Sequence, residues 1–338
     1  MKKVGILFGG KSAEHEISLL SAKNIYDAID KNIFEPVLIK IEKSGKWQMD
    51  AVSQFDVIFP ILHGPFGEDG TMQGFLKLAG LPFVGPGVLG SAAGMDKDVM
   101  KRLLRDAGIP IGKFIALGSH EQAPSFSEVQ AALAPNGLES QPIFIKPANM
   151  GSSVGISKVN NESEYSAALK EAFLYDAKII MEEFIPGREI ECAVLGNEEP
   201  VASVPGEIIP AHEFYSYDAK YLDEKGASLQ IPAKLDKETT KRVQDTAVKV
   251  FKTLCCEGLS RVDFFLRTDG SSAAQPSSAA QLEIIVNEIN TMPGFTRISM
   301  YPKMWEASGI SYTDLITRLI ELAFNRFEKE RKLKTSVT

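Results

Sequence analysis

The sequence predicts an α/β protein that begins with a parallel sheet, and three observations support this. Strand-like and helix-like stretches alternate early in the chain, with strands expected at residues 4–8, 37–41 and 57–62 and a helix at residues 17–29. Glycine-bearing segments follow the first and last of these strands, where a parallel sheet places its binding loops. The 338 residues also exceed one ordinary core, because domains typically have about 100–200 residues, so two or three domains are expected.

Composition narrows the class of protein. The chain is 44% hydrophobic and 24% charged, as is usual for globular proteins, and it has no apolar run near the roughly 20 residues that span a bilayer. The net charge of −7 and the lack of a long Lys/Arg block argue against nucleic acid as a partner. Three cysteines without metal-ligand or redox spacing fit a reducing compartment, so we expect a cytoplasmic protein that does not bind membranes.

The rest of the chain carries further element signals. Residues 80–87 are rich in Gly and Pro and mark a boundary, after which Asp96 caps a helix that ends near residue 107. The other expected helices cover residues 162–175, 237–256 and an amphipathic C-terminal stretch around Leu319. The other expected strands cover residues 143–146 and 178–184 and the surroundings of Asp263 and Glu288. The low-complexity stretch 268–281 is expected to be a hairpin tip without a catalytic part.

Two of these strands carry polar side chains that favour a metal site. Glu288 and Asn290 alternate along one strand and therefore share a face, and Asp263 lies in a neighbouring apolar strand. Two carboxylates and an amide oxygen are hard ligands that suit Mg²⁺ bridging nucleotide phosphates. The alternative is an exposed polar sheet face. The apolar neighbours argue against it, because they indicate a buried sheet where unpaired acids are costly.

Two further segments are consistent with a nucleotide site. Lys146 ends an apolar strand, and the Gly/Ser loop 150–155 follows it, so a cation and approachable backbone N–H groups lie near each other. The apolar strand 179–185 could run along an adenine, with Glu189 holding ribose hydroxyls. Each has a plainer interpretation, the loop as a common hairpin turn and the strand as a core strand beside two surface acids.

In chain order, these features resemble the ATP-grasp superfamily, in which two α+β domains clamp ATP between them. Five motifs narrow the similarity to the D-alanine–D-alanine ligases: Ala13-Glu14-His15-Glu16-Ile17-Ser18, His63-Gly64-Pro65-Phe66-Gly67-Glu68-Asp69-Gly70, Met95-Asp96-Lys97, Tyr217-Asp218-Ala219-Lys220-Tyr221 and Asn287-Glu288-Ile289-Asn290-Thr291-Met292-Pro293-Gly294. The resemblance extends from about residue 4 to residue 327. It implies an N-terminal parallel-sheet domain (1–94), followed by an ATP-grasp pair (95–186 and 187–338) with ATP between them.

The resemblance also implies a reaction. A D-alanine carboxylate would attack ATP to form D-alanyl phosphate, which the amine of a second D-alanine attacks, supplying peptidoglycan precursors. ATP would be bound by Lys97, Lys146, Glu182, Glu183, Phe184, Ile185 and Glu189, and two Mg²⁺, or Mn²⁺ in their place, by Asp263, Glu288 and Asn290. Glu183 stands where the family often has lysine, which makes the nucleotide preference less secure.

The remaining roles implied by the resemblance concern the two amino acids. Glu16 would hold the first ammonium group with His63 nearby, and Ser152 would link Glu16 to Tyr221. Arg261 and the Gly294 backbone would stabilise the oxyanion, and Ser299 and Met300 would bind the second D-alanine. Lys220 would reach the phosphate when a lid at about residues 213–230 closes and excludes water.

Other interpretations stay open at this point. His63 could simply cap or bridge within its own turn, and Glu16 could only stabilise the positive end of the helix dipole. Tyr221 could be an ordinary lid anchor. The whole chain could be an ATP-grasp ligase for another carboxylate and amine, or a nucleotide-binding protein without catalysis, although Arg261 beside a full metal set argues against the latter. D-Serine remains open as an alternative acceptor. A homodimer is implied by the resemblance alone.

Overall fold

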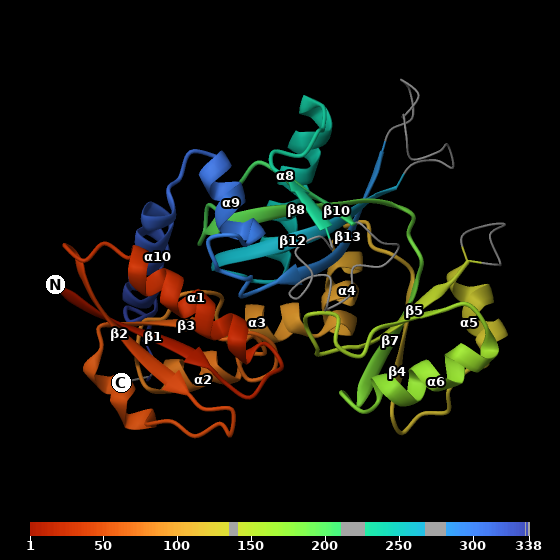
Figure 1. Cartoon of the computed structure of the whole chain (residues 1–338), viewed down its shortest axis with the longest axis horizontal. Coiled ribbons are helices and arrows are strands. Elements are labelled where there is room, and N and C mark those ends of the chain that lie inside the picture. The colour runs from red at the N-terminus through yellow and green to blue at the C-terminus, as the bar shows by residue number, and fades with distance from the viewer. Residues whose placement is uncertain (135–140, 211–226, 268–281, 335, 337–338) are drawn as a thin grey trace.

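The computed structural model describes residues 1–134, 141–210, 227–267, 282–334 and 336, and these residues form three β-sheets covered by helices (Figure 1). Within them, no helix is long and apolar enough to cross a membrane.

The first sheet is parallel, as the sequence predicts. Its central strand β1 (Lys2–Gly9) pairs with β2 (Phe34–Ile41) and β3 (Val57–Ile61). The middle of β1 and all of β3 are buried, which explains their continuous apolar sequences. Because parallel strands end at a common edge, the turns after Gly9 and Ile61 lie near each other. The nearby helices are α1 (His15–Ala28), the 3₁₀ helix η1 (Met49–Gln54) and α2 (Thr71–Leu78).

A second, four-stranded antiparallel sheet has the order β4-β7-β5-β6. Its strands are β4 (Phe114–Gly118), β5 (Ile143–Pro147), β6 (Ser157–Val159) and β7 (Lys178–Glu183). Helices α5 (Phe126–Leu133) and α6 (Glu162–Ala172) bury their apolar residues against this sheet. Neither β4 nor α5 was expected from the sequence.

The third sheet holds the predicted acidic strands. Its order is β11-β10-β8-β12-β13, with β9 paired to β8. The strands are β8 (Gly187–Gly196), β9 (Val201–Ala202), β10 (Gly206–Pro210), β11 (Ala227–Gln230), β12 (Gly258–Arg267) and β13 (Glu283–Asn290). Helices α8 (Lys237–Thr253), α9 (Met300–Ala307) and α10 (Tyr312–Glu330) pack on it. An irregularity in register falls directly after Asp263, where a bulge can re-aim a side chain.

Two helices connect the first sheet to the others. Helix α3 (Val88–Met95) precedes α4 (Lys97–Asp106), and Asp96 caps α4 by accepting a hydrogen bond from the Val99 N–H. The buried side chains of α4 share a core with α8 and the third sheet, although α4 was assigned to the central domain. The domain limits at residues 94/95 and 186/187 stay a prediction.

The N- and C-terminal parts share one core. Helix α10 lies beside α1 (Figure 1), and Leu319 and Ile320 belong to the same buried cluster as Ile6 and Phe59 of the parallel sheet. The rings of Phe59 and Phe295 meet edge-on with centroids 5.8 Å apart. The parallel sheet is therefore held directly against the C-terminal part of the chain.

Candidate active site

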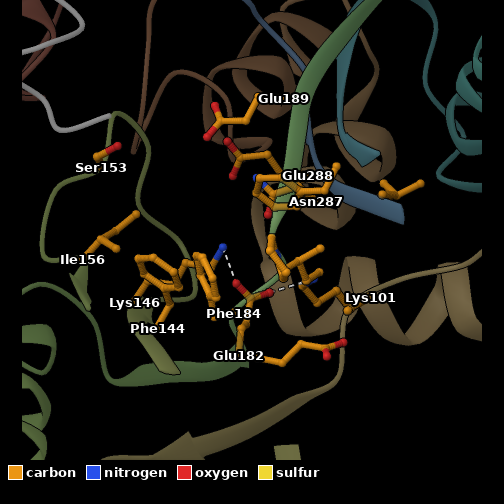
Figure 2. A pocket seen from close by; sticks show the side chains of 17 residues that line it. Lys101, Phe144, Lys146, Ser153, Ile156, Glu182, Phe184, Glu189, Asn287 and Glu288 are labelled. Atoms are coloured by element: carbon orange, nitrogen blue, oxygen red, sulfur yellow. Dashed lines mark ion pairs between the residues drawn. The ribbon is translucent and has the colours of Figure 1, made fainter. Parts of the chain in front are cut away.

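A cavity of about 280 Å³ lies between the second and third sheets (Figure 2). It is lined from one side by β5 and β7, from the other by β12 and β13, and at its end by the segment that joins β7 to β8. Of the residues predicted to bind ATP, Lys97 does not line it, and the other six do so together with Glu288: Lys146, Glu182, Glu183, Phe184, Ile185 and Glu189. Residues from distant parts of the sequence thus line one cavity.

One end of the cavity is apolar. The rings of Phe144 and Phe184 lie 6.2 Å apart between centroids, and Ile185 and Val286 are further lining residues. Gly112 also lines this end, and a Cβ at that position would lie 2.8 Å from the Ile185 Cδ1. Flat apolar walls beside exposed backbone suit a heteroaromatic base.

The other end of the cavity is strongly charged. Glu182 makes ion pairs with both Lys146 and Lys101, and its Oε1 lies 2.7 Å from the Lys101 Nζ. Burial raises the pKa of Glu182, but the two ammonium charges outweigh burial and hold this pKa at about 2. Burial lowers the pKa of Lys146, and the carboxylates of Glu182 and Glu288 more than reverse this effect. Two ammonium groups are therefore held beside Glu182, where a polyanion would bind.

The Gly/Ser loop is tied to this charged end. The Lys97 Nζ donates a hydrogen bond of 2.6 Å to the Met150 carbonyl oxygen and lies 4.0 Å from the Glu288 Oε2. Burial, reinforced by repulsion from Lys146, lowers the pKa of Lys97 despite the attraction of Glu288. Ser152 and Ser153 adopt left-handed φ angles of 52° and 61°, which are uncommon for residues with a Cβ. Such strain is concentrated at functional loops.

The acidic strands bring the three predicted metal ligands together. Asp263 on β12 is opposite Glu288 on β13, and the Asn290 Nδ2 donates a hydrogen bond of 2.9 Å to the Asp263 Oδ2. The donor chemistry fits Mg²⁺, which prefers oxygen ligands. The described residues contain no group of three or more His, Cys, Asp or Glu that could hold a metal ion.

Arg261 is locked among carboxylates beside this set. Its Nε and Nη2 donate hydrogen bonds of 2.7 and 2.8 Å to the two oxygens of Asp263, and its Nε lies 2.9 Å from the Glu191 Oε2. Burial lowers the pKa of Arg261, but Asp263 and Glu191 outweigh burial and raise it well above its ordinary value. Arg261 is thus a permanent, oriented cation, as an oxyanion-stabilising role requires.

A second polar cluster lies at the edge of the parallel sheet. The Ser152 Oγ donates a hydrogen bond to the Glu14 Oε1, and a Cβ on Gly64, next to His63, would lie 3.1 Å from the Glu14 Oε2. His63 is buried, with its Nδ1 3.0 Å from the Met292 carbonyl oxygen and 3.5 Å from the Glu68 Oε1. Burial raises the pKa of Glu68 to about 7, and its neighbour Glu14 adds to this shift.

The structure corrects the assignment of Glu16. Its side chain is about two-thirds exposed and pairs with Lys43 at 2.7 Å, and Ser152 bonds Glu14 instead. The physical reason is the start of α1 at His15, since residues two apart at a helix start point to opposite sides. Glu14, in the loop before the helix, faces the cluster. Glu16, in the first turn, faces solvent.

The other predicted residues fall into two groups. Gly294 and Ser299 are close to one another, because a Cβ on Gly294 would lie 3.2 Å from the Ser299 Oγ, and Met300 begins α9 with its side chain buried. Lys220, Tyr221 and most of the predicted lid lie outside the described residues, as does the 268–281 stretch.

Comparisons with known proteins identify the family. A model described as "D-ala D-ala ligase C-terminus" matches residues 103–321, and one described as "D-ala D-ala ligase N-terminus" matches residues 3–54 and 48–86. The chain belongs to the D-alanine–D-alanine ligase family. Among curated ligases of this family, it is 50% identical to a D-alanine–D-alanine ligase of Oceanobacillus iheyensis, with 99% of this chain and 98% of the relative covered. It is 48% identical to D-alanine–D-alanine ligase A of Escherichia coli, with 99% of each covered.

Solved structures agree with this family assignment. The ligase from Coxiella burnetii matches with a TM-score of 0.83 at 36% identity, covering 98% of each chain. The VanG D-Ala:D-Ser ligase from Enterococcus faecalis matches with a TM-score of 0.82 at 36% identity, covering 95% of this chain and 99% of that one. A Bacillus anthracis D-alanine–D-alanine ligase complexed with ATP matches with a TM-score of 0.78 at 28% identity, covering 98% of this chain and 100% of that one.

Besides Glu14, sequence reasoning missed three further charged residues of this ligase site. Lys101 is one helical turn after Lys97 on the capped helix α4, but nothing in the sequence indicates that it is buried. Glu191 follows Glu189 by two residues on β8, so the two lie on the same face of the strand. Glu68 was visible within the His63–Gly70 motif but was given no role.

Proposed function

We propose that this chain joins two D-alanine molecules into D-alanyl-D-alanine at the expense of ATP, through a D-alanyl phosphate intermediate. The proposal depends on the observation that one loop connects the nucleotide cavity to the Glu14 cluster. The loop 150–155 connects the charged cavity through Lys97 and Ser153 to the Glu14 cluster through Ser152. A nucleotide and an amino acid bound at these two places would share one loop.

The residues would divide the work as follows. The cavity backbone at 184–186 and Glu189 would hold adenosine, while Lys146 and Lys97 would offset the phosphate charge. In the first step, an oxygen of the D-alanine carboxylate bonds to the γ-phosphorus, and the bond to ADP breaks. Positioning and charge neutralisation supply most of the catalysis in such a transfer.

The Glu14 cluster is suited to the first D-alanine. The Glu14 carboxylate would pair with its ammonium group, with His63 beside it and Ser152 fixing the carboxylate. In the second step, the amine of the other D-alanine bonds to the acyl carbon and phosphate leaves. Arg261 and the Gly294 N–H would stabilise the negative oxygen that develops there. Ser299, beside Gly294, would bind the carboxylate of the second D-alanine, with Met300 next to it, and in the lid Lys220 and Tyr221 keep their predicted roles.

Asp263, Glu288 and Asn290 would hold Mg²⁺, in the predicted number of two and with Mn²⁺ as a substitute. The metal would supply charge neutralisation on the phosphate oxygens. This chain's residues prepare that site by holding Asp263 beside Arg261 and by placing Glu288 near Lys97.

Further parts of the proposal rest on family likeness. They are a homodimer, a cytoplasmic location and a role in supplying peptidoglycan precursors. The acceptor is the least determined part, because one similar structure is a D-Ala:D-Ser ligase. D-Alanine is the acceptor we propose, and D-serine is the specific competitor.

The test is phosphate release from ATP and Mg²⁺ with D-alanine, L-alanine, D-serine or D-lactate, with products identified by mass spectrometry. When D-alanine is the only acid supplied, the reaction should release phosphate and D-alanyl-D-alanine in equal amounts. Phosphate release that does not depend on D-alanine, or phosphate release from D-alanine without formation of this dipeptide, would refute the proposal. A mixed product from D-alanine plus D-serine would change only the acceptor.

A further inference from the structure

We propose that Lys101 is a positioning residue that acts as the standing counter-ion of Glu182 and so leaves the Lys146 ammonium available to the nucleotide. The inference rests on the proposed nucleotide site and deepens it. Lys101 has no part in the sequence-derived account of ATP binding.

The Lys101–Glu182 ion pair is almost completely buried. The side chain of Lys101 is 2% exposed, that of Glu182 is 9% exposed and that of Lys146 is 8% exposed. Charged side chains are rarely buried to this degree, because removing them from water is costly unless they are paired. Lys101 lies on α4, whereas Glu182 and Lys146 lie on β7 and β5, so the cluster joins a helix to the sheet across the cavity (Figure 2).

The role of Lys101 follows from the number of cations that pair with Glu182. Glu182 contacts two ammonium groups, one through each carboxylate oxygen. If Lys146 turns toward a phosphate, Glu182 keeps one cation only because Lys101 is present. Without Lys101, moving Lys146 would leave a buried carboxylate unpaired, which is strongly unfavourable. Glu182 would then hold Lys146 away from the phosphates.

This reasoning predicts a distinctive pattern of rescue. Lys101→Met should weaken ATP binding by about tenfold or more, since it makes Lys146 the sole partner of a buried charge. Lys101→Arg keeps a cation and should recover most of the affinity. Lys101→Met combined with Glu182→Gln should also recover affinity relative to Lys101→Met alone, because a neutral Gln no longer needs Lys146. A residue that only fills space would not be rescued by a change in its partner's charge.

The experiment is titration of each full-length variant with ATP and Mg²⁺ by calorimetry, without D-alanine, after thermal melting has confirmed folding. Direct binding separates this inference from the ligase proposal, because it requires no product. A weaker affinity in Lys101→Met that is regained in both other variants is the expected result. Wild-type affinity in Lys101→Met, or no recovery in the double variant, would overturn the inference.

If Lys101→Met does not fold, the double variant still tests the idea, because it removes the Lys101–Glu182 pair as a unit while Glu288 still attracts the Lys146 ammonium. It should bind ATP within about threefold of the double variant Lys101→Arg with Glu182→Gln, since a neutral Gln makes the cation dispensable. A much larger deficit would show that Lys101 acts on the nucleotide independently of Glu182 and would overturn the inference.

Discussion

The two glutamates at the start of α1 offer a sharp test, because the sequence favours one and the structure the other. Glu14→Gln keeps the size of the side chain but removes the charge that faces the His63 cluster. It also converts the bond from Ser152 to one with a neutral acceptor. Glu16→Gln is the matched control, with the same chemical change two residues away on an exposed side chain.

The size of the effect follows from the proposed hydrogen bond between the Glu14 carboxylate and the ammonium group of D-alanine, which loses its charged acceptor in Glu14→Gln. A hydrogen bond to a charged group is worth about 1.5–3 kcal/mol, and its removal from the D-alanine complex corresponds to about a 10- to 150-fold fall in kcat/KM for D-alanine. Glu16 and Lys43 are both mostly solvent-exposed, so the Glu16→Gln effect should stay within about twofold.

The assay is initial-rate phosphate release at saturating ATP with varied D-alanine, repeated with varied ATP at saturating D-alanine. Glu14→Gln should change the D-alanine dependence and leave the KM for ATP nearly constant, because Glu14 does not line the nucleotide cavity. Equal falls in the two variants, or a larger fall in Glu16→Gln, would refute the placement of Glu14.

The remaining predictions concern Arg261, Glu68 and the three cysteines. Arg261→Ala should depress turnover roughly 10²–10³-fold, because an oxyanion donor is removed. It should also lower the free energy of unfolding by about 3–5 kcal/mol in urea titrations, because Glu191 and Asp263 lose their shared cation; unchanged stability would contradict this. Glu68 has a folded-state pKa of about 7 against an ordinary 4.5, so the folded protein binds more protons in that window and loses stability as pH rises through it. Glu68→Gln should flatten that slope between about pH 4.5 and 7 in denaturant titrations, and an identical slope would count against the assignment. Burial raises the pKa of Cys192 to about 12 and that of Cys256 further, so iodoacetamide should label only the exposed Cys255 until denaturant is added; rapid labelling of all three would show that the core is open.

Much of the architecture could be predicted because it follows from local patterns. The continuous apolar runs of β1 and β3 and the capping residue Asp96 are such patterns, and all three appear as expected. The strands at Asp263 and Glu288 were also found, since alternation fixes which side chains share a face. Strand β8, the centre of the third sheet, was not recognised, because its polar residues interrupt the apolar pattern where it lines the site.

The site was harder to predict where the answer depends on a helix boundary or on packing. A shift of two residues at the start of α1 exchanges the roles of Glu14 and Glu16, and element ends are the least certain part of a sequence-based assignment. Lys101 looks like a surface lysine in the sequence. Only the tertiary fold buries it and brings it to Glu182 on β7 of the second sheet, more than eighty residues away. Tertiary contacts of this kind leave no local signature.

The central claim is that a D-alanine carboxylate attacks ATP and is then joined to a second D-alanine. D-Alanine labelled with ¹⁸O in its carboxylate tests this directly, because an oxygen that bonds to phosphorus leaves with the phosphate. Mass spectrometry of the products should find one ¹⁸O in each phosphate released and unlabelled ADP, in step with D-alanyl-D-alanine. Phosphate without ¹⁸O would mean that water attacks ATP, and would contradict the account.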